Sequence, residues 1–342
     1  MGLDKKSGIR IGKGIPGALD LITDVPGVKV GHVTVRDGES VNTGVTAVLP
    51  HGGNLFRDKV MAGAAVINGF GKTMGLVQID ELGTIETPII LTNTLSIGTA
   101  ATALIKYMLE QNDDIGLTTG TVNPIVCECN DGTLNDIRGF HVKEDHVFKA
   151  LENADVLFEE GAVGAGTGMR CMGLKGGIGS ASRIISIEDK TYTVGALVLS
   201  NFGSLENLTV DGRRIGRKIK EKLDSEDADK GSIIMLIATD VPLTERQLKR
   251  VARRAGAGLA RTGSYYGNGS GDIAIAFTTA NRLPHKSKSA FSEIRMINDA
   301  SIDPVLEMTA EAVEEAIISS LYHAEPMKGR GGRLWHSLRE FI

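Results

Sequence analysis

The sequence has little cysteine, no long apolar run and no cluster of basic residues. Cysteine occurs only at positions 127, 129 and 171 of the 342 residues. An odd number of cysteines without a second close pair predicts neither a disulfide framework nor a zinc site, so we interpret all three as buried thiols. No segment reaches the roughly 20 consecutive apolar residues of a membrane span. Residues 1–22 lack the apolar core of a signal peptide, so we expect a cytoplasmic protein, and nothing predicts a metal or cofactor.

The charge balance argues against nucleic acids as partners. The formal net charge is −4 and the basic residues are dispersed, so the sequence does not predict nucleic-acid binding. Apolar residues make up 42% and charged residues 23%, as is typical of globular proteins, and the length suffices for one large domain or two. Glycine is abundant, with 43 residues, but it marks the ends of expected elements and forms no repeat.

The most informative stretch is residues 261–272, which separate a helix from a strand. Residues 231–239 predict a buried strand, and residues 244–261 predict an amphipathic helix that begins with a capping-box pattern at Thr244 and Gln247. Residues 273–277 are short, apolar and strand-like. The chain therefore leaves a helix, passes glycines at 263, 267, 269 and 271, and enters a core strand with Ser270 at its start.

Ser270 between two glycines admits two interpretations. The glycines could serve only a turn that needs φ > 0. Alternatively, the unprotected hydroxyl attacks the Gly269 carbonyl, an ester forms, and water releases a new chain that begins with Ser270. Its α-amine, with a pKa near 8, can then act as the base for its own hydroxyl, and no histidine is required.

The order of motifs resembles the L-aminopeptidase/D-esterase family, which includes the β-aminopeptidases. Matching segments lie at 22–32, 44–50, 128–136, 164–168, 200–203 and 261–281, so the resemblance covers almost the whole chain. It implies an α/β fold of four layers, αββα, of the N-terminal-nucleophile type and related to the ornithine acetyltransferase fold. It also implies one catalytic domain, 1–342, that cleaves itself into chains 1–269 and 270–342 and forms a homo-oligomer, a tetramer of two-chain units.

The resemblance further implies roles for individual residues. Glu128 interrupts an apolar run, which by itself fits either an edge strand or a pocket; the matching glutamate of the family binds the free amino group of the substrate. Asn201 ends a predicted strand at 191–203 and by resemblance is the oxyanion donor, although an ordinary turn asparagine would look the same. Asn130 belongs to the substrate site, but some family members have tyrosine there, so the acyl-side selectivity is not implied.

A hydroxyl-x-glutamate pair supports the nucleophile in this family. Thr309 and Glu311 fit that wording, and Glu314 is a rival. All three fall on a helix expected to open at Asp303, as the cap, and Pro304, with its glutamates mainly on a solvated face. Positions i and i+2 of a regular helix point about 200° apart, so the pairing does not follow from helical geometry.

The sequence also predicts the structure of several segments outside these motifs. Residues 80–86 and 204–230 read as exposed polar segments, residues 291–297 as a strand, and the tail around Trp335 as helical. Residues 160–179 are glycine-rich but match neither the phosphate-loop nor the dinucleotide spacing, so we expect closely approaching backbone near a substrate. His51 beside two glycines could be a ligand or base, or only a loop residue.

Three functions remain open at this point. The first is a self-activating aminopeptidase or amidase that acts on short peptides, amino-acid amides or esters through a Ser270 acyl-enzyme. The second is an acetyl transferase or N-acyl-amino-acid hydrolase on the same fold, although the related transferases use a threonine nucleophile. The third is a non-catalytic small-molecule binder whose glycine-rich loops only shape a pocket.

Overall fold

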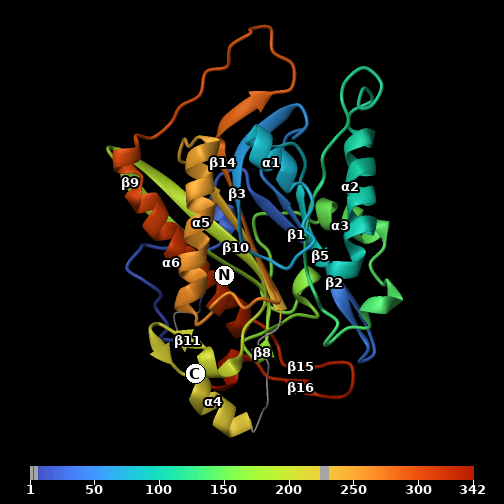
Figure 1. The fold of residues 1–342 in the computed structure, drawn as a ribbon, viewed down its shortest axis with the longest axis vertical. Helices are drawn as coiled ribbons and strands as arrows, with labels where there is room; N and C mark the ends of the chain where they lie inside the picture. The colour runs from blue at the N-terminus through green and yellow to red at the C-terminus, as the bar shows by residue number, and fades with distance from the viewer. Residues whose placement is uncertain (1–2, 4–6, 224–230) are drawn as a thin grey trace.

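The computed structural model describes residue 3, residues 7–223 and residues 231–342. Two sheets pack face to face, with α5 and α6 outside one and α2 and α3 outside the other (Figure 1). The elements in chain order are β1 (Lys29–Asp37), β2 (Val41–Leu49), β3 (Asp58–Gly69), α1 (Leu76–Leu82), β4 (Thr84–Ile85), β5 (Ile89–Asn93), α2 (Ile97–Glu110), β6 (Ile125–Cys129), α3 (Glu144–Glu152), β7 (Arg170–Cys171), β8 (Leu174–Lys175), β9 (Gly177–Ile187), β10 (Lys190–Asn201), β11 (Thr209–Val210), β12 (Arg213–Arg214), α4 (Gly216–Leu223), β13 (Gly231–Thr239), α5 (Glu245–Arg261), β14 (Ser270–Pro284), α6 (Asp303–Tyr322), β15 (Met327–Lys328) and β16 (Leu334–Trp335).

The larger sheet has six strands in the order β4-β3-β14-β13-β10-β9, and the smaller has four in the order β1-β2-β5-β6. Most neighbours are antiparallel, but β13 and β14 are parallel, as are β5 and β6. In the parallel pair β13–β14, Gly231 lies opposite Ser270. The predicted strand and the predicted nucleophile therefore start side by side at the same end of the sheet.

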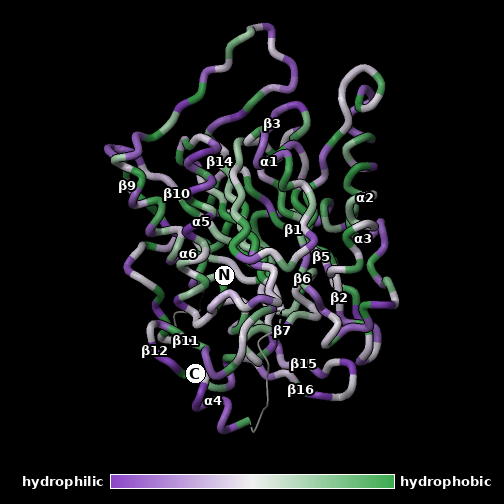
Figure 2. Tube along the Cα trace, viewed as in Figure 1, coloured by the Kyte–Doolittle hydropathy of each residue, from purple (hydrophilic) through white to green (hydrophobic). Residues whose placement is uncertain are grey.

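Alternation along the strands separates three apolar cores. Ile273, Ile275 and Phe277 of β14 face the smaller sheet, whereas Ala274 and Ala276 face α5 and α6. A further core joins the smaller sheet to α2 and α3. In Figure 2 the hydrophobic residues accordingly follow the strands through the centre of the molecule. This arrangement is the predicted αββα sandwich, which is confirmed.

Helix α5 forms where its sequence predicts. The Thr244 side chain accepts a hydrogen bond from the Gln247 N–H, and the Gln247 side chain accepts one from the Thr244 N–H, which satisfies two N–H groups that the helix leaves without intrahelical acceptors. The predicted stripe is buried along its whole length: Leu248, Val251, Ala252, Ala255 and Leu259. Because α5 is anchored on the sheet, the loop after it is held next to the start of β14.

Several expectations for peripheral segments are wrong. Residues 80–82 end α1 and are exposed as expected, but residues 83–86 are buried: they form β4 and then Glu86, which binds Lys59 and Asn123. Residues 204–223 contain β11, β12 and α4 packed on the core, while 224–230 lie outside the described residues. Residues 291–297 form no strand, and the segment between β14 and α6 extends away from the body in Figure 1. Around Trp335 the tail pairs as the β15–β16 hairpin instead of a helix.

Helix α6 is buried almost all round, which the sequence analysis did not predict. Its N-cap is Ile302, and Asp303 is already inside the first turn. Glu311, Glu314 and Glu315 are between 4% and 7% exposed, so the glutamate side is covered and not solvated. The helix lies against β9, β10 and α5, and residues 11–14 of the N-terminal segment pack over its remaining face. Across the described part of the chain, no helix is both long and apolar enough to cross a membrane.

Candidate active site

A cavity of about 500 Å³ opens where β6 and β10 end and β13 and β14 begin. It collects segments that are far apart in sequence, including both residues that the family resemblance assigns to substrate binding, Glu128 and Asn130, and the predicted oxyanion donor Asn201. The lining residues are Phe70, Lys72, Thr94, Glu128, Asn130, Gly132, Thr133, Arg170, Asn201, Gly231, Ser232 and Gly269. The structure therefore brings the residue before Ser270 into one wall with these three side chains.

Ser270 occupies the first position of β14 and is 7% exposed. Its N–H donates to the Gly267 carbonyl at 2.8 Å, which closes a tight turn just before the strand. Its hydroxyl donates to Asp272 Oδ1 at 2.6 Å, because residues i and i+2 of a strand lie on the same face. A Cβ added at Gly269 would meet no atom within 4 Å, so the space beside the predicted scissile peptide is open.

Asn68 of β3 binds the loop that carries this peptide. Its Nδ2 donates to the carbonyl oxygens of Gly267 at 3.1 Å and Asn268 at 3.4 Å, and it also contacts that of Ser270. The Phe70 N–H donates to the Ser270 carbonyl as well, at 3.2 Å. The backbone on both sides of the Gly269–Ser270 bond is thus held by the neighbouring strand.

Glu128 lies on β6 between two cysteines that face the core between the sheets. Alternation places its own side chain on the opposite face, at the cavity, where it is 3% exposed. Oε1 accepts the Lys72 N–H at 3.0 Å, and Oε2 accepts the Thr94 hydroxyl. Each carboxylate oxygen has a further lone pair with which to accept from a cation in the cavity.

Asn201 is the last residue of β10, and its amide orientation is determined by two hydrogen bonds. Oδ1 accepts the Arg170 N–H at 3.0 Å, so Nδ2 must point the other way, where it donates to the Asn130 carbonyl at 3.0 Å. The Asn130 side chain accepts the Gly132 N–H at 2.9 Å and shapes the turn below Glu128. The following residue, Asp131, is fully buried, and burial raises its pKa to about 6.

Three predicted supporting residues bind elsewhere. The Thr309 hydroxyl donates to the Val305 carbonyl one turn earlier in α6, at 2.7 Å. Glu311 accepts the N–H groups of residues 13 and 14 at 3.1 and 2.8 Å. Glu314 pairs with Arg261 at 3.3 Å, and burial raises its pKa. None of these three described residues is among those that line the cavity, and their support of the nucleophile remains a prediction.

The remaining candidates have structural partners. All three cysteines are buried and free, and burial raises the pKa of Cys127 and of Cys171 to about 12, which makes them poor nucleophiles. His51 uses both ring nitrogens, one with the Asp58 carbonyl and one with the Gly53 N–H. Within the described ranges, no group of three or more His, Cys, Asp or Glu side chains is placed to hold a metal ion.

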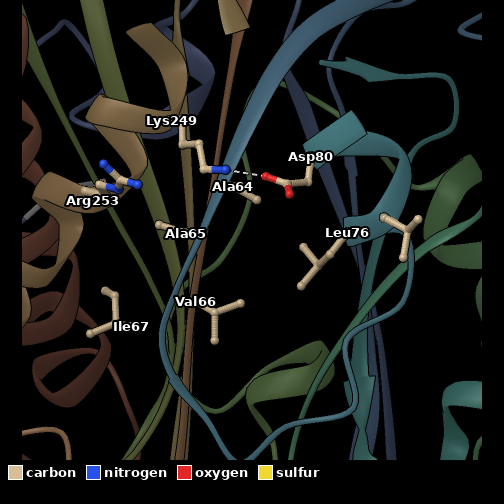
Figure 3. A pocket seen from close by; sticks show the side chains of 9 residues that line it. Ala64, Ala65, Val66, Ile67, Leu76, Asp80, Lys249 and Arg253 are labelled. Atoms are coloured by element: carbon tan, nitrogen blue, oxygen red, sulfur yellow. Dashed lines mark hydrogen bonds and ion pairs between the residues drawn. The ribbon is translucent and has the colours of Figure 1, made fainter. Parts of the chain in front are cut away.

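A second cavity, of about 530 Å³, lies between β3, α1 and α5 (Figure 3). Its lining is apolar apart from Asp80, Lys249 and Arg253, and Asp80 pairs with Lys249 across it. Serine, threonine and cysteine are absent from the described residues that line this second cavity.

A two-sheet sandwich with a serine at the first position of a central strand has the architecture of an N-terminal-nucleophile hydrolase. Sequence comparison identifies the family. The model of peptidase family S58 matches residues 20–335, so the chain belongs to peptidase family S58 and is a peptidase.

Individual relatives agree with this assignment. The beta-peptidyl aminopeptidase BapA of Sphingosinicella microcystinivorans is 39% identical over 342 aligned positions, covering 93% of this chain and 85% of the relative. The crystal structure of the PH0078 protein from Pyrococcus horikoshii OT3 is similar with a TM-score of 0.95 and 58% identity, covering 99% of this chain and 96% of that one. The L-aminopeptidase D-Ala-esterase/amidase from Ochrobactrum anthropi, described as a variant among the Ntn hydrolase fold, has a TM-score of 0.92 and 37% identity, covering 99% and 96%. The predicted family and fold are confirmed.

Sequence reasoning missed several residues around the site. Asp272 could have been found, because Ser-x-Asp on a strand puts both side chains on one face. Asn68, Lys72 and Thr94 gave no local signal, since each reaches the site only through the pairing of distant segments.

Proposed function

We propose that this chain is a self-processing aminopeptidase that removes N-terminal residues from short peptides, amino-acid amides or esters. The observation that carries the proposal is the meeting of Gly269, Glu128 and Asn201 in one cavity. An anion, an amide donor and a strand-initial serine are what an attack on the carbonyl next to a free amino group requires. The aminopeptidase names of the relatives BapA and the Ochrobactrum enzyme support the same class.

Self-processing starts from the uncleaved chain. The Ser270 hydroxyl, which donates to Asp272 at 2.6 Å, gives its proton to that carboxylate, and the Ser270 oxygen attacks the Gly269 carbonyl carbon. The Gly269–Ser270 C–N bond breaks, the nitrogen takes the proton back from Asp272 and leaves as the amine of Ser270, and an ester joins Gly269 to the Ser270 oxygen. Water hydrolyses this ester, giving chains 1–269 and 270–342. Asn68 supports the step by holding the carbonyls on both sides of the bond.

Turnover uses the new terminus. The substrate ammonium is bound by Glu128, a charge-assisted contact in a largely buried position. Ser270 Oγ attacks the substrate carbonyl while the α-amine of the same residue takes the proton. The second Nδ2 hydrogen of Asn201 stabilises the oxyanion; loss of one such donor costs about 3 kcal/mol in the transition state. The amine or alcohol leaves with the proton, and water hydrolyses the acyl-enzyme.

The test of the proposal is the serine itself. We expect the wild type to give two chains, with the smaller one starting at Ser270 by N-terminal sequencing. Ser270→Ala should remain one chain and hydrolyse no aminoacyl p-nitroanilide. Ser264→Ala, which removes a hydroxyl from the same loop, is the matched control and should still be cleaved. An active wild type whose intact mass is that of the undivided polypeptide would refute the proposal.

Two finer features are also proposed on the family resemblance alone. We expect the two-chain unit to assemble as a homo-tetramer in the cytoplasm. Light scattering coupled to gel filtration measures the assembly, and a monomeric two-chain unit would contradict it.

A further inference from the structure

Lys175 carries a buried amino group whose hydrogen-bond partners are all backbone carbonyls. The residue ends the short strand β8 and is 0% exposed. Its Nζ donates to the carbonyl oxygens of Gly166 at 3.1 Å, Met169 at 2.7 Å and Gly176 at 2.6 Å. Burial and the charge of Arg36 lower the pKa of Lys175. Only the ammonium form, however, has three N–H donors for three acceptors. The three carbonyls, which we call the carbonyl cage, therefore favour the charged form of Lys175.

The cage is rigid because its glycines are closely packed. A Cβ at Gly166 would lie 2.5 Å from the Ile178 nitrogen, and one at Gly176 would lie 2.6 Å from the Ser200 carbonyl oxygen. The backbone approaches its neighbours too closely for any other residue. The carbonyls therefore converge on one point, and that point is the lysine nitrogen.

One of the caged peptides also binds Asn201. The carbonyl of Met169 accepts from Lys175, and the N–H of the same peptide unit, that of Arg170, donates to Asn201 Oδ1 at 3.0 Å. Asn201 Nδ2 in turn donates to the Asn130 carbonyl. Ammonium, peptide and side-chain amide thus form one continuous chain of hydrogen bonds that ends at the cavity. In such a chain each polarised amide strengthens the next bond.

We propose that Lys175 is a positioning residue for the hydrolytic reaction, acting through the Met169–Arg170 peptide on the oxyanion donor Asn201. This inference rests on the proposed function, which assigns the oxyanion to Asn201. By binding the Met169 carbonyl, Lys175 holds the Met169–Arg170 peptide in place, and the Arg170 N–H keeps the Asn201 amide from flipping. The charge of Lys175 draws electron density through this peptide and through the Asn201 amide. The Nδ2 hydrogen therefore becomes a stronger donor when negative charge develops on the substrate carbonyl.

A purely structural role for Lys175 has a different consequence. A lysine that only holds the loop together would, when removed, lower stability and disturb the whole cavity, whether or not Asn201 is present. A lysine that acts through Asn201 loses its effect on turnover once Asn201 is gone. A double-mutant cycle separates the two, because it measures the coupling between two residues.

The experiment compares wild type, Lys175→Met, Asn201→Ala and the double variant. Activity on an aminoacyl p-nitroanilide is expressed per processed chain, with the processed fraction read from gels. We expect Lys175→Met to lower kcat on the order of ten-fold with little change in KM, less than the 10²- to 10³-fold of a lost donor. In the Asn201→Ala background the same change should lower kcat less than about two-fold.

Control variants and contrary results separate a role of Lys175 in turnover from a role in stability alone. Lys59→Met removes another lysine, one that is 16% exposed and paired with Glu86 outside the cavity, and should lower the melting temperature without lowering kcat. If Lys175→Met does not fold or mature, Lys175→Gln, which keeps an N–H donor but no charge, replaces it in the cycle. Equal losses in both backgrounds, or full kcat with only a lower melting temperature, would overturn the role of Lys175. Full turnover in Asn201→Ala alone would instead refute the assignment of the oxyanion to Asn201.

Discussion

Replacing Glu128 by glutamine tests the recognition of the substrate amino group. The carboxylate is 3% exposed, and its oxygens accept the Lys72 N–H and the Thr94 hydroxyl. In Glu128→Gln the remaining oxygen can still accept from Lys72, and the Thr94 hydroxyl can turn to accept from the new amide. The site should therefore keep its shape, and the variant should lose only the negative charge.

The size of the effect follows from this geometry. Unit charges about 3 Å apart attract by about 5 kcal/mol at an effective dielectric constant near 20. Lost hydration of the substrate ammonium offsets part of this energy, and hydrogen bonds to charged groups contribute about 1.5–3 kcal/mol net. We therefore expect KM for an aminoacyl p-nitroanilide to rise roughly 10- to 150-fold.

The assay needs a matched substrate without the amino group. The corresponding des-amino acyl p-nitroanilide has the same scissile bond but no cation. Wild type should prefer the amino substrate, and Glu128→Gln should lose that preference while its rate on the des-amino substrate stays unchanged. An equal loss on both substrates would show that Glu128 supports the cavity and does not bind the ammonium.

Two further predictions concern acids near the site. Asp272→Asn keeps an oxygen that can accept from the Ser270 hydroxyl but removes the carboxylate that can take its proton, so self-cleavage should slow by roughly 10²-fold or more. The decay of the uncleaved band on gels measures this, and an unchanged rate would exclude Asp272 as the base. Asp131 has its pKa raised from 3.8 to about 6 by burial, which corresponds to about 3 kcal/mol. Because the folded protein favours protonated Asp131, this stabilisation is complete below about pH 4 and is lost as pH rises through about 6. Asp131→Asn should therefore raise the free energy of unfolding, relative to its parent, by up to about 3 kcal/mol at pH 8 and by little at pH 4. Urea unfolding in the uncleaved Ser270→Ala background measures this difference. If the free energies of unfolding of parent and variant change with pH in parallel, the prediction is wrong.

Features that depend on neighbouring residues could be predicted. The limits of β13 and the cap of α5 agree with the sequence, because a short apolar run and the Thr244–Gln247 pattern are encoded within a few residues. Ser270 at the mouth of a strand followed from the same local pattern. The assignment of Glu128 and Asn201 to one site needed the family resemblance, since nothing local connects them.

The predictions were wrong where the surroundings of a segment are formed by residues far away in the sequence. The glutamates of α6 looked solvated, yet Arg183 of β9 pairs with Glu311 and Glu315, and the N-terminal backbone covers them. Residues 291–297 have strand-like composition but no neighbouring strand with which to pair, as far as the structure describes the chain. The composition of a segment indicates which secondary structure it can form, whereas its burial depends on which other segments pack against it.

The sequence by itself determined strand β13, helix α5 with its cap, and the serine between two glycines where the next strand begins, whereas the αββα order of layers came from the family resemblance. Only the tertiary structure decided which groups surround that serine. Asn68 reaches the Ser270 carbonyl across 202 residues of sequence, and Lys175 reaches Asn201 through a single peptide unit. Such contacts depend on strand order and close backbone packing, and these are properties of the folded chain that no short stretch of residues encodes.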